Sequence, residues 1–141
     1  MENLSLMNKS VRLMHKLYAK KIPFLPRAIQ QINRLVFACD IPRSVIIGEN
    51  TVFAHSGLGC VIHSKAIIGK NCKIQQNITI GGRGTKGTPI IGDNVFIGAG
   101  ATIMGDVKVG DNAKIGAMSL VIDSVAPNTT VVGIPAKGVN K

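Results

Sequence analysis

Histidine and cysteine are the side chain types most able to act as a base or a nucleophile near neutral pH. The chain has three of each: His15, His55, His63, Cys39, Cys60 and Cys72. No two cysteines have CxxC spacing, and an odd number argues against a disulfide framework, so we expect reduced thiols. We expect no bound metal, because a three-histidine zinc site would need one more histidine than the repeat region described below contains.

His55 is the strongest candidate for a general base. It lies between Phe53 and Ile62, where a six-residue repeat loses its register. Its side chain should therefore leave the aliphatic wall and enter a loop, the usual place for chemistry on a rigid scaffold. There an imidazole could take the proton of an attacking hydroxyl group. We expect His15 to be structural or solvated in a basic helical segment, and His63 to lie at the surface.

The repeat that surrounds His55 predicts the fold. An aliphatic residue recurs at every sixth position in the series Ile91, Ile97, Ile103, Val109, Ile115 and Val121. The same register occurs upstream at Ile41, Ile47 and Phe53, and again at Ile62, Ile68, Ile74 and Ile80. Steps of six place residues about 240° apart around an α-helix, so a helix does not explain the pattern. Hexads are typical of a short-strand solenoid with Gly, Asn or Asp in its turns.

The first 40 residues follow a different pattern. All 16 glycines lie at or after Gly48. Before this point, apolar residues recur at three- and four-residue steps from Leu4 to Tyr18 and from Ala28 to Val36, which predicts two short amphipathic helices. We therefore divide the chain into a basic amphipathic helical segment, residues 1–39, and a β-helix domain, residues 40–141, with an extended loop at about residues 81–89.

Composition excludes several classes of protein. The net charge is +10, but the repeat region offers only Phe53 and Phe96 for stacking on bases, which argues against a nucleic-acid binder. No apolar run is long enough to span a bilayer, and the N-terminus lacks the hydrophobic stretch of a signal peptide. We expect a cytoplasmic protein. The basic stretch at residues 9–34 would contact the inner face of the membrane or pack on the first coil or between subunits.

Several stretches carry a resemblance to a known family over roughly residues 39 to 138. They are DIPRSVIIG, FAHSGLG with His55, ITIGG, IGAGATIMG, AKIGAMSLV and VVGIPAK. Together they resemble the hexapeptide-repeat acyltransferases, and among these the serine acetyltransferase branch, which includes O-acetyltransferases of polysaccharide biosynthesis. The resemblance implies a mainly β fold, a left-handed parallel β-helix with three hexads per coil. It also implies acetyl-CoA as co-substrate and a homotrimer with its sites between subunits.

The resemblance also assigns roles to particular residues. His55 would be the catalytic base, and Asp40, fifteen residues earlier and so about one coil away, would hydrogen-bond it. The alternative is that Asp40 only caps or turns the chain before Pro42. For the coenzyme, the implied residues are Gly81 and Gly82 beside the pantetheine arm, Ala99 and Ala117 along the groove, and Lys137, with Arg83 or Lys86, at the phosphates. The loop GGRGTKGTP is no P-loop, because the GK[ST] ending is absent.

Two cysteines bear on the route of transfer. Cys72 occupies the inward position four residues after Ile68, so we expect it to be buried and unreactive. Cys60 follows the His55 loop, and the sequence alone does not exclude that its thiol carries the acetyl group. We favour direct transfer to the acceptor, because no cysteine has an activating partner in the sequence.

The acceptor is predicted from two departures from the family pattern. Family members that act on serine often carry Asp before the histidine, where this chain has Ala54, and Arg-His at the end of the long loop, where it has Gly87 and Thr88. A pocket without these charges would bind a zwitterion poorly, so we expect a sugar hydroxyl of a surface-polysaccharide pathway. Serine is the alternative acceptor, and a catalytically inactive scaffold is the alternative of another class.

Overall fold

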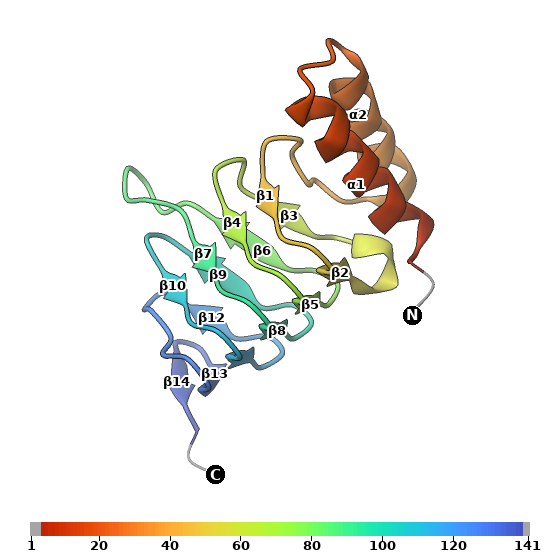
Figure 1. Cartoon of the computed structure of the whole chain (residues 1–141). Coiled ribbons are helices and arrows are strands. Elements are labelled where there is room, and N and C mark those ends of the chain that lie inside the picture. The colour runs from red at the N-terminus through yellow and green to blue at the C-terminus, as the bar shows by residue number, and fades with distance from the viewer. Residues whose placement is uncertain (1–3, 140–141) are drawn as a thin grey trace.

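The computed structural model describes residues 4–139, in which two helices precede a parallel β-helix (Figure 1). The helices are α1 (Leu6–Ala19) and α2 (Leu25–Phe37). This confirms the expected fold class, a left-handed parallel β-helix with a helical segment at its N-terminal end. The first three residues of the predicted helical segment and the last two of the predicted β-helix domain lie outside the described residues.

Three parallel sheets form the walls of the β-helix. The first sheet contains β1 (Ile46–Ile47), β4 (Ile67–Ile68), β7 (Ile90–Ile91) and β10 (Lys108–Val109). The second contains β2 (Val52–Phe53), β5 (Lys73–Ile74), β8 (Phe96–Ile97), β11 (Lys114–Ile115), β13 (Thr130–Gly133) and β14 (Ala136–Gly138). The third contains β3 (Val61–Ile62), β6 (Thr79–Gly81), β9 (Thr102–Met104) and β12 (Leu120–Val121). Only the β13–β14 pair is antiparallel among these strands.

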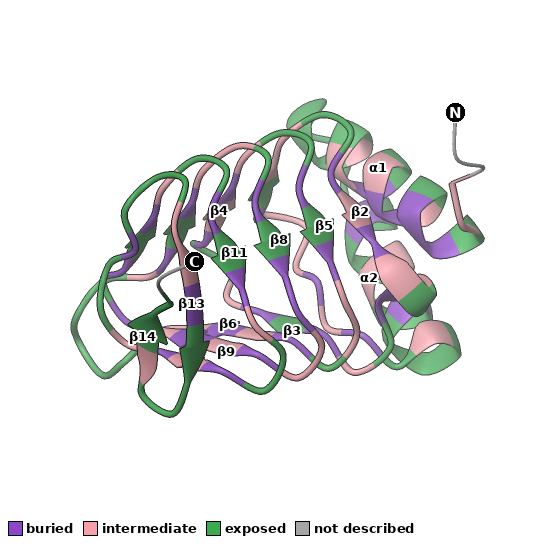
Figure 2. Ribbon diagram, turned by 90° about the horizontal axis from the view of Figure 1, so that it is seen from below, coloured by how far each residue is buried: buried purple, intermediate pink, exposed green. Residues whose placement is uncertain are grey.

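The hexad residues point inward, as the sequence predicts. Each member of the series from Ile91 to Val121 is at most 2% exposed. The residues four positions later are also buried: Val95, Ala101, Val107, Ala113, Ser119 and Val125. Figure 2 shows that buried segments (purple) alternate with exposed ones (green) along the strands, and that this pattern recurs from coil to coil. Ile47 differs, because it is only partly buried and lines a groove beneath α1.

Glycine and asparagine have different structural roles in the turns between strands. Asn50, Asn71 and Asn94 adopt φ of 58°, 55° and 57°, the left-handed region that asparagine tolerates. Gly48 is not left-handed but is needed for close stacking, since a Cβ on it would lie 2.5 Å from the backbone carbon of Gly69 on the next coil. The turns therefore require glycine for contact between coils and asparagine for the backbone bend.

Helix α1 covers the open end of the first coil. Its residues Met7, Val11 and Met14 are buried and belong to the same hydrophobic core as the coils. The helix begins after Ser5, whose hydroxyl accepts a hydrogen bond from the Asn8 backbone N–H at 3.3 Å. This packing satisfies one of the two roles expected for the basic stretch, contact with the first coil.

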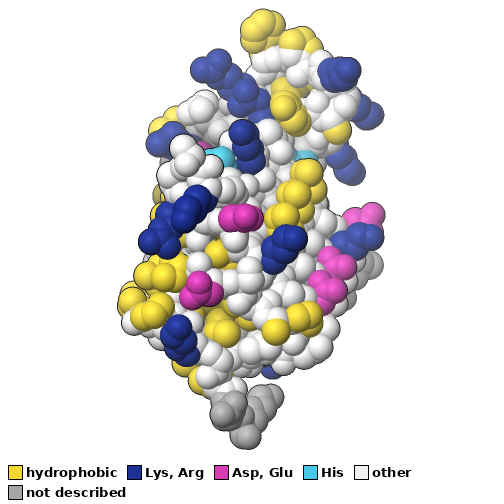
Figure 3. All heavy atoms as spheres, turned by 90° about the vertical axis from the view of Figure 1, so that its left-hand side faces the viewer, with side chains coloured by type: hydrophobic (Ala, Val, Ile, Leu, Met, Phe, Trp, Pro, Cys, Tyr) yellow, Lys and Arg dark blue, Asp and Glu magenta, His cyan; other side chains and the backbone are white. Residues whose placement is uncertain are grey.

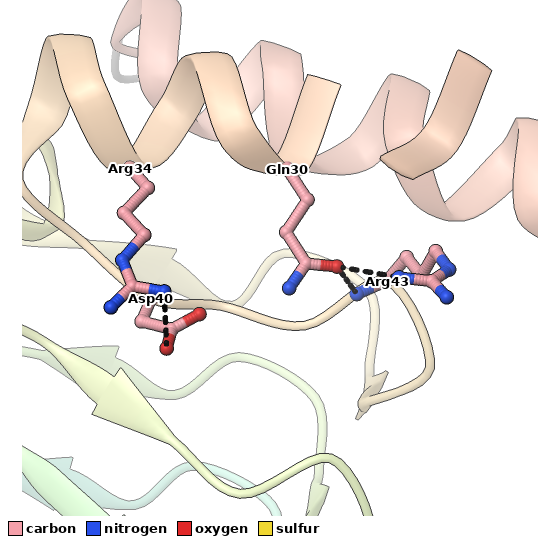
Figure 4. A network of polar contacts seen from close by, with 4 residues as sticks. All are labelled: Gln30, Arg34, Asp40 and Arg43. Atoms are coloured by element: carbon pink, nitrogen blue, oxygen red, sulfur yellow. Dashed lines mark hydrogen bonds and ion pairs between the residues drawn. The ribbon is translucent and has the colours of Figure 1, made fainter. Parts of the chain in front are cut away.

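Helix α2 packs beside α1 and is joined by side chains to the segment that enters the β-helix (Figure 4). Gln30 Oε1 accepts hydrogen bonds from the backbone N–H and from the Nη1 of Arg43, at 3.2 and 3.1 Å. Arg34 forms an ion pair with Asp40. The sequence places the start of this helix after Pro26, but the helix begins at Leu25, because proline is tolerated in a first turn, where its missing N–H needs no partner.

Candidate active site

His55 lies in a loop that projects from the wall of the β-helix. After β2 the chain forms a short 3₁₀ segment, η1 (Ala54–Gly57), in which His55 and Ser56 have φ of 49° and 55°. Two consecutive left-handed residues turn the chain out of the hexad register, and the side chain of His55 is exposed. The structure therefore places this histidine where the loss of periodicity predicts it.

Helix α1 holds the start of this loop through one buried side chain. Asn8, 6% exposed, accepts a hydrogen bond from the Phe53 N–H at 2.9 Å and donates its Nδ2 to the Phe53 carbonyl at 2.9 Å. The same Nδ2 lies 2.8 Å from the Ser5 hydroxyl. Met7 packs against Gly57, leaving no room for a Cβ there. Both ends of η1 are thus fixed by α1, and the sequence analysis missed these contacts because Asn8 is one polar residue in an amphipathic helix.

A cavity of about 430 Å³ opens beside His55. Its lining includes Ser5 and Asn8 from the helical end and Lys73 and Gln75 from the next coil. Lys73 pairs in register with Val52, one residue before Phe53, so its outward side chain belongs to the coil that stacks under the histidine loop. Lys73 is not among the residues expected at the site, although its outward hexad position one coil after the histidine is a usable signal in the sequence.

Asp40 lies at the same corner of the β-helix as the histidine loop. Its N–H donates to the Cys60 carbonyl at 2.8 Å, and its carbonyl accepts from the Ile62 N–H at 2.9 Å, so its backbone lies beside the end of that loop. Its carboxylate is 33% exposed, and its Oδ2 is 3.9 Å from the Arg34 Nη1. Within residues 4–139 no hydrogen bond joins Asp40 to His55, and the expected contact between their side chains stays a prediction.

The two alanines predicted for the coenzyme groove share a corner with His55. Phe53, Ile74 and Ile97 are register partners on successive coils, and Ile115 follows on the next coil. Two positions later in the last three of these coils stand Gln76, Ala99 and Ala117, which form one column, and the Asn77 N–H donates to the Leu58 carbonyl at 2.8 Å, so Leu58 continues this column and His55 lies outside it on the loop just before. The Met118 N–H donates to the Ala99 carbonyl at 2.8 Å, which fixes the lower part of this column. The small side chains of Ala99 and Ala117 leave the surface of this corner low on the later coils, after Gln76.

The other predicted coenzyme residues lie elsewhere on the chain. Gly81 ends β6, and Gly82 and Arg83 follow it at the far edge of the third sheet, about six residues and roughly 20 Å of extended chain from Gln76. Gly82 packs beside His63, and Arg83 forms an isolated antiparallel bridge with Lys86, which makes the long loop a small hairpin. Lys137 lies exposed in β14 at the C-terminal end. One chain does not bring these residues to His55.

The cysteines are buried, as the sequence predicts for Cys72. Cys60 and Cys72 have no exposed surface, and Cys39 is 1% exposed. Burial raises the pKa of Cys60 and of Cys72, and it raises the pKa of Cys39 to about 11, with smaller contributions from Cys60 and Asp40. A buried neutral thiol is a poor nucleophile, so the structure gives no support to Cys60 as an acyl carrier.

The described part of the chain contains neither a metal-binding cluster nor a membrane-spanning helix. Residues 4–139 contain no cluster of three or more His, Cys, Asp or Glu side chains that could hold a metal ion. In the same residues no helix has both the length and the apolar content to cross a membrane.

The other two histidines make structural contacts. His63 accepts a hydrogen bond from the Lys65 N–H at its Nδ1 (3.1 Å), and His15 contacts the Pro42 carbonyl at 3.2 Å.

A hexad-built β-helix with a histidine on a loop at one corner defines a class of proteins, and family models identify that class. A model described as bacterial transferase hexapeptide (six repeats) matches residues 88–123, and one described as hexapeptide repeat of succinyl-transferase matches residues 44–81. The chain belongs to the hexapeptide acyltransferase superfamily.

Within this superfamily, the chain is similar to several serine acetyltransferases. A serine acetyltransferase of Synechococcus elongatus is 38% identical over 129 residues, which cover 89% of this chain and 52% of the relative. The soybean serine acetyltransferase complexed with serine is 41% identical with a TM-score of 0.86, over 94% of this chain and 56% of that one. The serine acetyltransferase of Brucella abortus in complex with coenzyme A is 33% identical with a TM-score of 0.87, over 94% and 54%. The chain thus spans about half the length of these proteins.

Proposed function

We propose that this chain carries the catalytic part of an O-acetyltransferase that uses acetyl-CoA. The observation that carries the proposal is His55, an exposed histidine on a loop that α1 contacts at both ends, beside a cavity and at the corner of the β-helix that carries Ala99 and Ala117 on later coils. A rigidly held base next to open space is what general base catalysis requires. The similarity to serine acetyltransferases, one of them in complex with coenzyme A, supports the choice of reaction and co-substrate.

In the proposed reaction His55 takes the proton of the acceptor hydroxyl as its oxygen attacks the thioester carbonyl carbon. The tetrahedral intermediate collapses, the carbon–sulfur bond breaks, and the thiolate of coenzyme A leaves. The imidazolium returns its proton to that thiolate, so the enzyme ends unchanged. Direct transfer agrees with the burial of Cys60 and Cys72, which leaves no exposed thiol in residues 4–139 to carry the acetyl group.

Asp40 is the proposed partner that orients His55 and stabilises the imidazolium. The carboxylate lies at the same corner and is paired with Arg34, whose side chain is 62% exposed. An exposed ion pair at 3.9 Å contributes about 0–1 kcal/mol, so exchange of Arg34 for the imidazolium would lose little. An Asp40→Asn variant tests this role, because it should lower kcat while KM for acetyl-CoA stays within about twofold.

A trimer would complete the coenzyme site. Ala99 and Ala117 lie on later coils at the corner where the His55 loop projects, whereas Gly81, Gly82 and Arg83 lie across the width of the third sheet on the same chain. Residues on opposite edges of one β-helix can meet only when neighbouring copies lie side by side. We therefore propose a homotrimer in which the long loop of one copy, and Lys137 at the phosphates, complete the groove below the histidine of the next. Sedimentation equilibrium should give a mass of three chains.

Serine is the acceptor that the similar proteins favour, in preference to the sugar hydroxyl expected from the sequence. Relatives named serine acetyltransferases match the chain at 38–44% identity, and one matching structure is described as complexed with serine. The specific observation that keeps a sugar as second candidate is the pair of positions Ala54 and Gly87–Thr88, which offer no charge to a zwitterion. Saturable acetylation of serine, measured beside nucleotide-linked and lipid-linked sugars, decides between the two.

The activity itself is tested with His55→Ala. We expect kcat to fall by on the order of 10² or more, with coenzyme A binding by calorimetry retained. The exposed position of His55 means that the variant should fold normally. Unchanged turnover would remove His55 from the mechanism. If the unaltered protein bound no acetyl-CoA and acetylated none of the acceptors, the inactive-scaffold alternative would be correct.

A further inference from the structure

The turn between α1 and α2 carries several large apolar side chains that are exposed to solvent. We call residues 18–27 the helical tip. Within it, Tyr18, Ile22, Phe24 and Leu25 are 45%, 40%, 88% and 48% exposed. These four side chains lie at the end of the helical pair remote from the coils' C-terminal end, where Figure 1 shows the α1–α2 turn projecting from the molecule. Four large apolar side chains in ten residues form a patch rather than scattered exposure.

Positive charge surrounds this patch. Lys20, Lys21 and Arg27 belong to the helical tip and are exposed. They belong to a series of seven cations, Lys9, Arg12, Lys16, Lys20, Lys21, Arg27 and Arg34, and no acidic residue occurs between Glu2 and Asp40. In Figure 3 dark blue side chains lie on both sides of the yellow ones at this end of the molecule. The partner of the helical tip must therefore accept apolar groups and carry negative charge.

Phe24 has a backbone conformation that an aromatic residue seldom adopts. Its φ is 61° and its ψ −43°, and it precedes the first turn of α2. A bulky residue at positive φ is an outlier that is normally compensated by packing. Phe24 has no such compensation within the described chain, since 88% of its surface is exposed. The Leu25 N–H donates to the Pro23 carbonyl at 2.7 Å, so Phe24 is the central residue of a γ-turn of the rare, strained kind, and an exposed aromatic residue at such a position points to a contact outside the fold.

We propose that the helical tip docks on an anionic lipid bilayer, independently of the acetyl transfer proposed above. Phe24 and Leu25 would enter the boundary between headgroups and acyl chains, where aromatic and aliphatic side chains are favoured. Lys20, Lys21 and Arg27 would lie at the negatively charged surface. A second copy of this chain fits less well, because a symmetric contact would bring the cations of two tips together. Nucleic acid would match the charge but offers no apolar interior to Phe24.

The direct test is cosedimentation with vesicles. The full chain is mixed with large unilamellar vesicles of phosphatidylcholine alone or with 30% phosphatidylglycerol, at about 50 and 500 mM salt. We expect association with the anionic vesicles at low salt, at least about tenfold stronger than with neutral vesicles, and a marked loss at high salt. Equal association with both vesicle types, or none with either, would overturn the proposal.

Three variants separate the contributions of charge and apolar contact. Lys20→Glu with Lys21→Glu should weaken association at least about 25-fold, since each cation near the surface contributes about fivefold. Lys108→Glu with Lys114→Glu, on exposed strand positions of the β-helix, makes the same change in net charge and should weaken it much less. Phe24→Asn removes the aromatic ring at an 88% exposed position, where no packing is lost, and we expect association about tenfold weaker, with circular dichroism checking that the variant is folded.

Comparison of the two double variants shows whether vesicle association depends on the helical tip or only on the net charge of the chain. If both double variants weaken association equally, only net charge matters and no docking site exists at the helical tip. If Phe24→Asn leaves vesicle association unchanged, the apolar part of the proposal is wrong. Sedimentation velocity without lipid tests the second-copy alternative: concentration-dependent self-association that Phe24→Asn abolishes would replace the lipid surface by a protein interface.

Discussion

The coils and the helical segment differ in how completely they bury their apolar residues. In the coils, each inward hexad residue from Ile91 to Val121 is at most 2% exposed and stacks on the equivalent residue of a neighbouring coil. In α2 only Pro26 and Asn33 are buried, while Leu35 and Val36 are 86% and 65% exposed. The coils therefore gain stability from many equivalent neighbour contacts, as repeat proteins do. The helical segment depends on a few contacts, each of which occurs once.

This difference concerns the candidate site, because His55 lies where the two regions meet. The start of the loop at Phe53 is anchored both by the regular ladder and by Asn8 of α1, and Met7 of the same helix packs against its end at Gly57. A change within the coils should therefore affect the stability of the whole chain. A change in the Asn8 contact should affect the position of one loop.

The largest effect is expected from a cavity in the coils. Ile103 has no exposed surface, and Ile103→Ala should lower the free energy of unfolding by about 2–5 kcal/mol, because the neighbouring coils prevent the cavity from closing. The matched change Leu35→Ala on α2 should stay within about 0.5 kcal/mol, since that side chain is 86% exposed. Urea unfolding followed by circular dichroism measures both. Equal losses would mean that α2 is packed in solution and that the contrast between the regions does not hold.

The second effect is expected from the contact between the regions. Asn8→Ala leaves the Phe53 N–H and carbonyl without partners, which costs about 1–3 kcal/mol of stability. It should also lower kcat with little change in KM for acetyl-CoA, because the loop that holds His55 loses one anchor. Steady-state kinetics and thermal unfolding give the two readouts.

Ser10→Ala is the control for that prediction. Ser10 lies on the same helix and donates its hydroxyl to Asn33 Oδ1 at 2.7 Å, at the contact with α2 and away from the histidine loop. The control should lose stability without losing kcat. If it lowers kcat as strongly as Asn8→Ala, the activity depends on general packing of α1 and not on positioning of His55.

The same contrast explains which features could be predicted from the sequence. The coils repeat one solution, so Ile91 and its successors carry a periodic signal that predicts the fold, the inward positions and the place where His55 leaves the register. Asn8 carries no such signal, because its contact with Phe53 joins residues 45 positions apart and occurs once. The start of α2 was misplaced for a similar reason, since Pro26 is compatible with a first turn and with a helix boundary.

The candidate site was predictable only in part. Ala99 and Ala117 are placed in one column by the coil period, which the sequence contains, but two insertions separate this column from His55, so the sequence alone does not place the histidine at the same corner. The separation of Gly81 and Gly82 from that column depends on which edge of the sheet each residue occupies, which requires the lengths of all intervening turns. The pairing of Asp40 with Arg34 depends on the orientation of α2, for which the sequence has no equivalent of the hexad.

The smallest effect is expected from His15, in the groove between α1 and the first coil. The Pro42 carbonyl can only accept, so the Nε2–H of His15 donates to it at 3.2 Å. Burial lowers the pKa of His15, and the bond to Pro42 opposes this only in part. Charged side chains of both signs line the same groove, Arg12 and Lys16 from α1 and Glu49 from the first coil.

Because the folded pKa of His15 lies below the unfolded value, the unfolded chain binds a proton at the higher pH. Stability from the neutral imidazole is therefore complete above about pH 6.5, the usual histidine value, and declines as the pH falls through the folded pKa, by less than about 1.4 kcal/mol per pH unit. His15→Gln keeps a donor for Pro42 but does not titrate. Urea unfolding at pH 8.0 and 5.5 should give a smaller difference for this variant than for the unaltered chain. Equal differences would place the pH dependence in other groups and leave the α1 groove indifferent to the charge of His15.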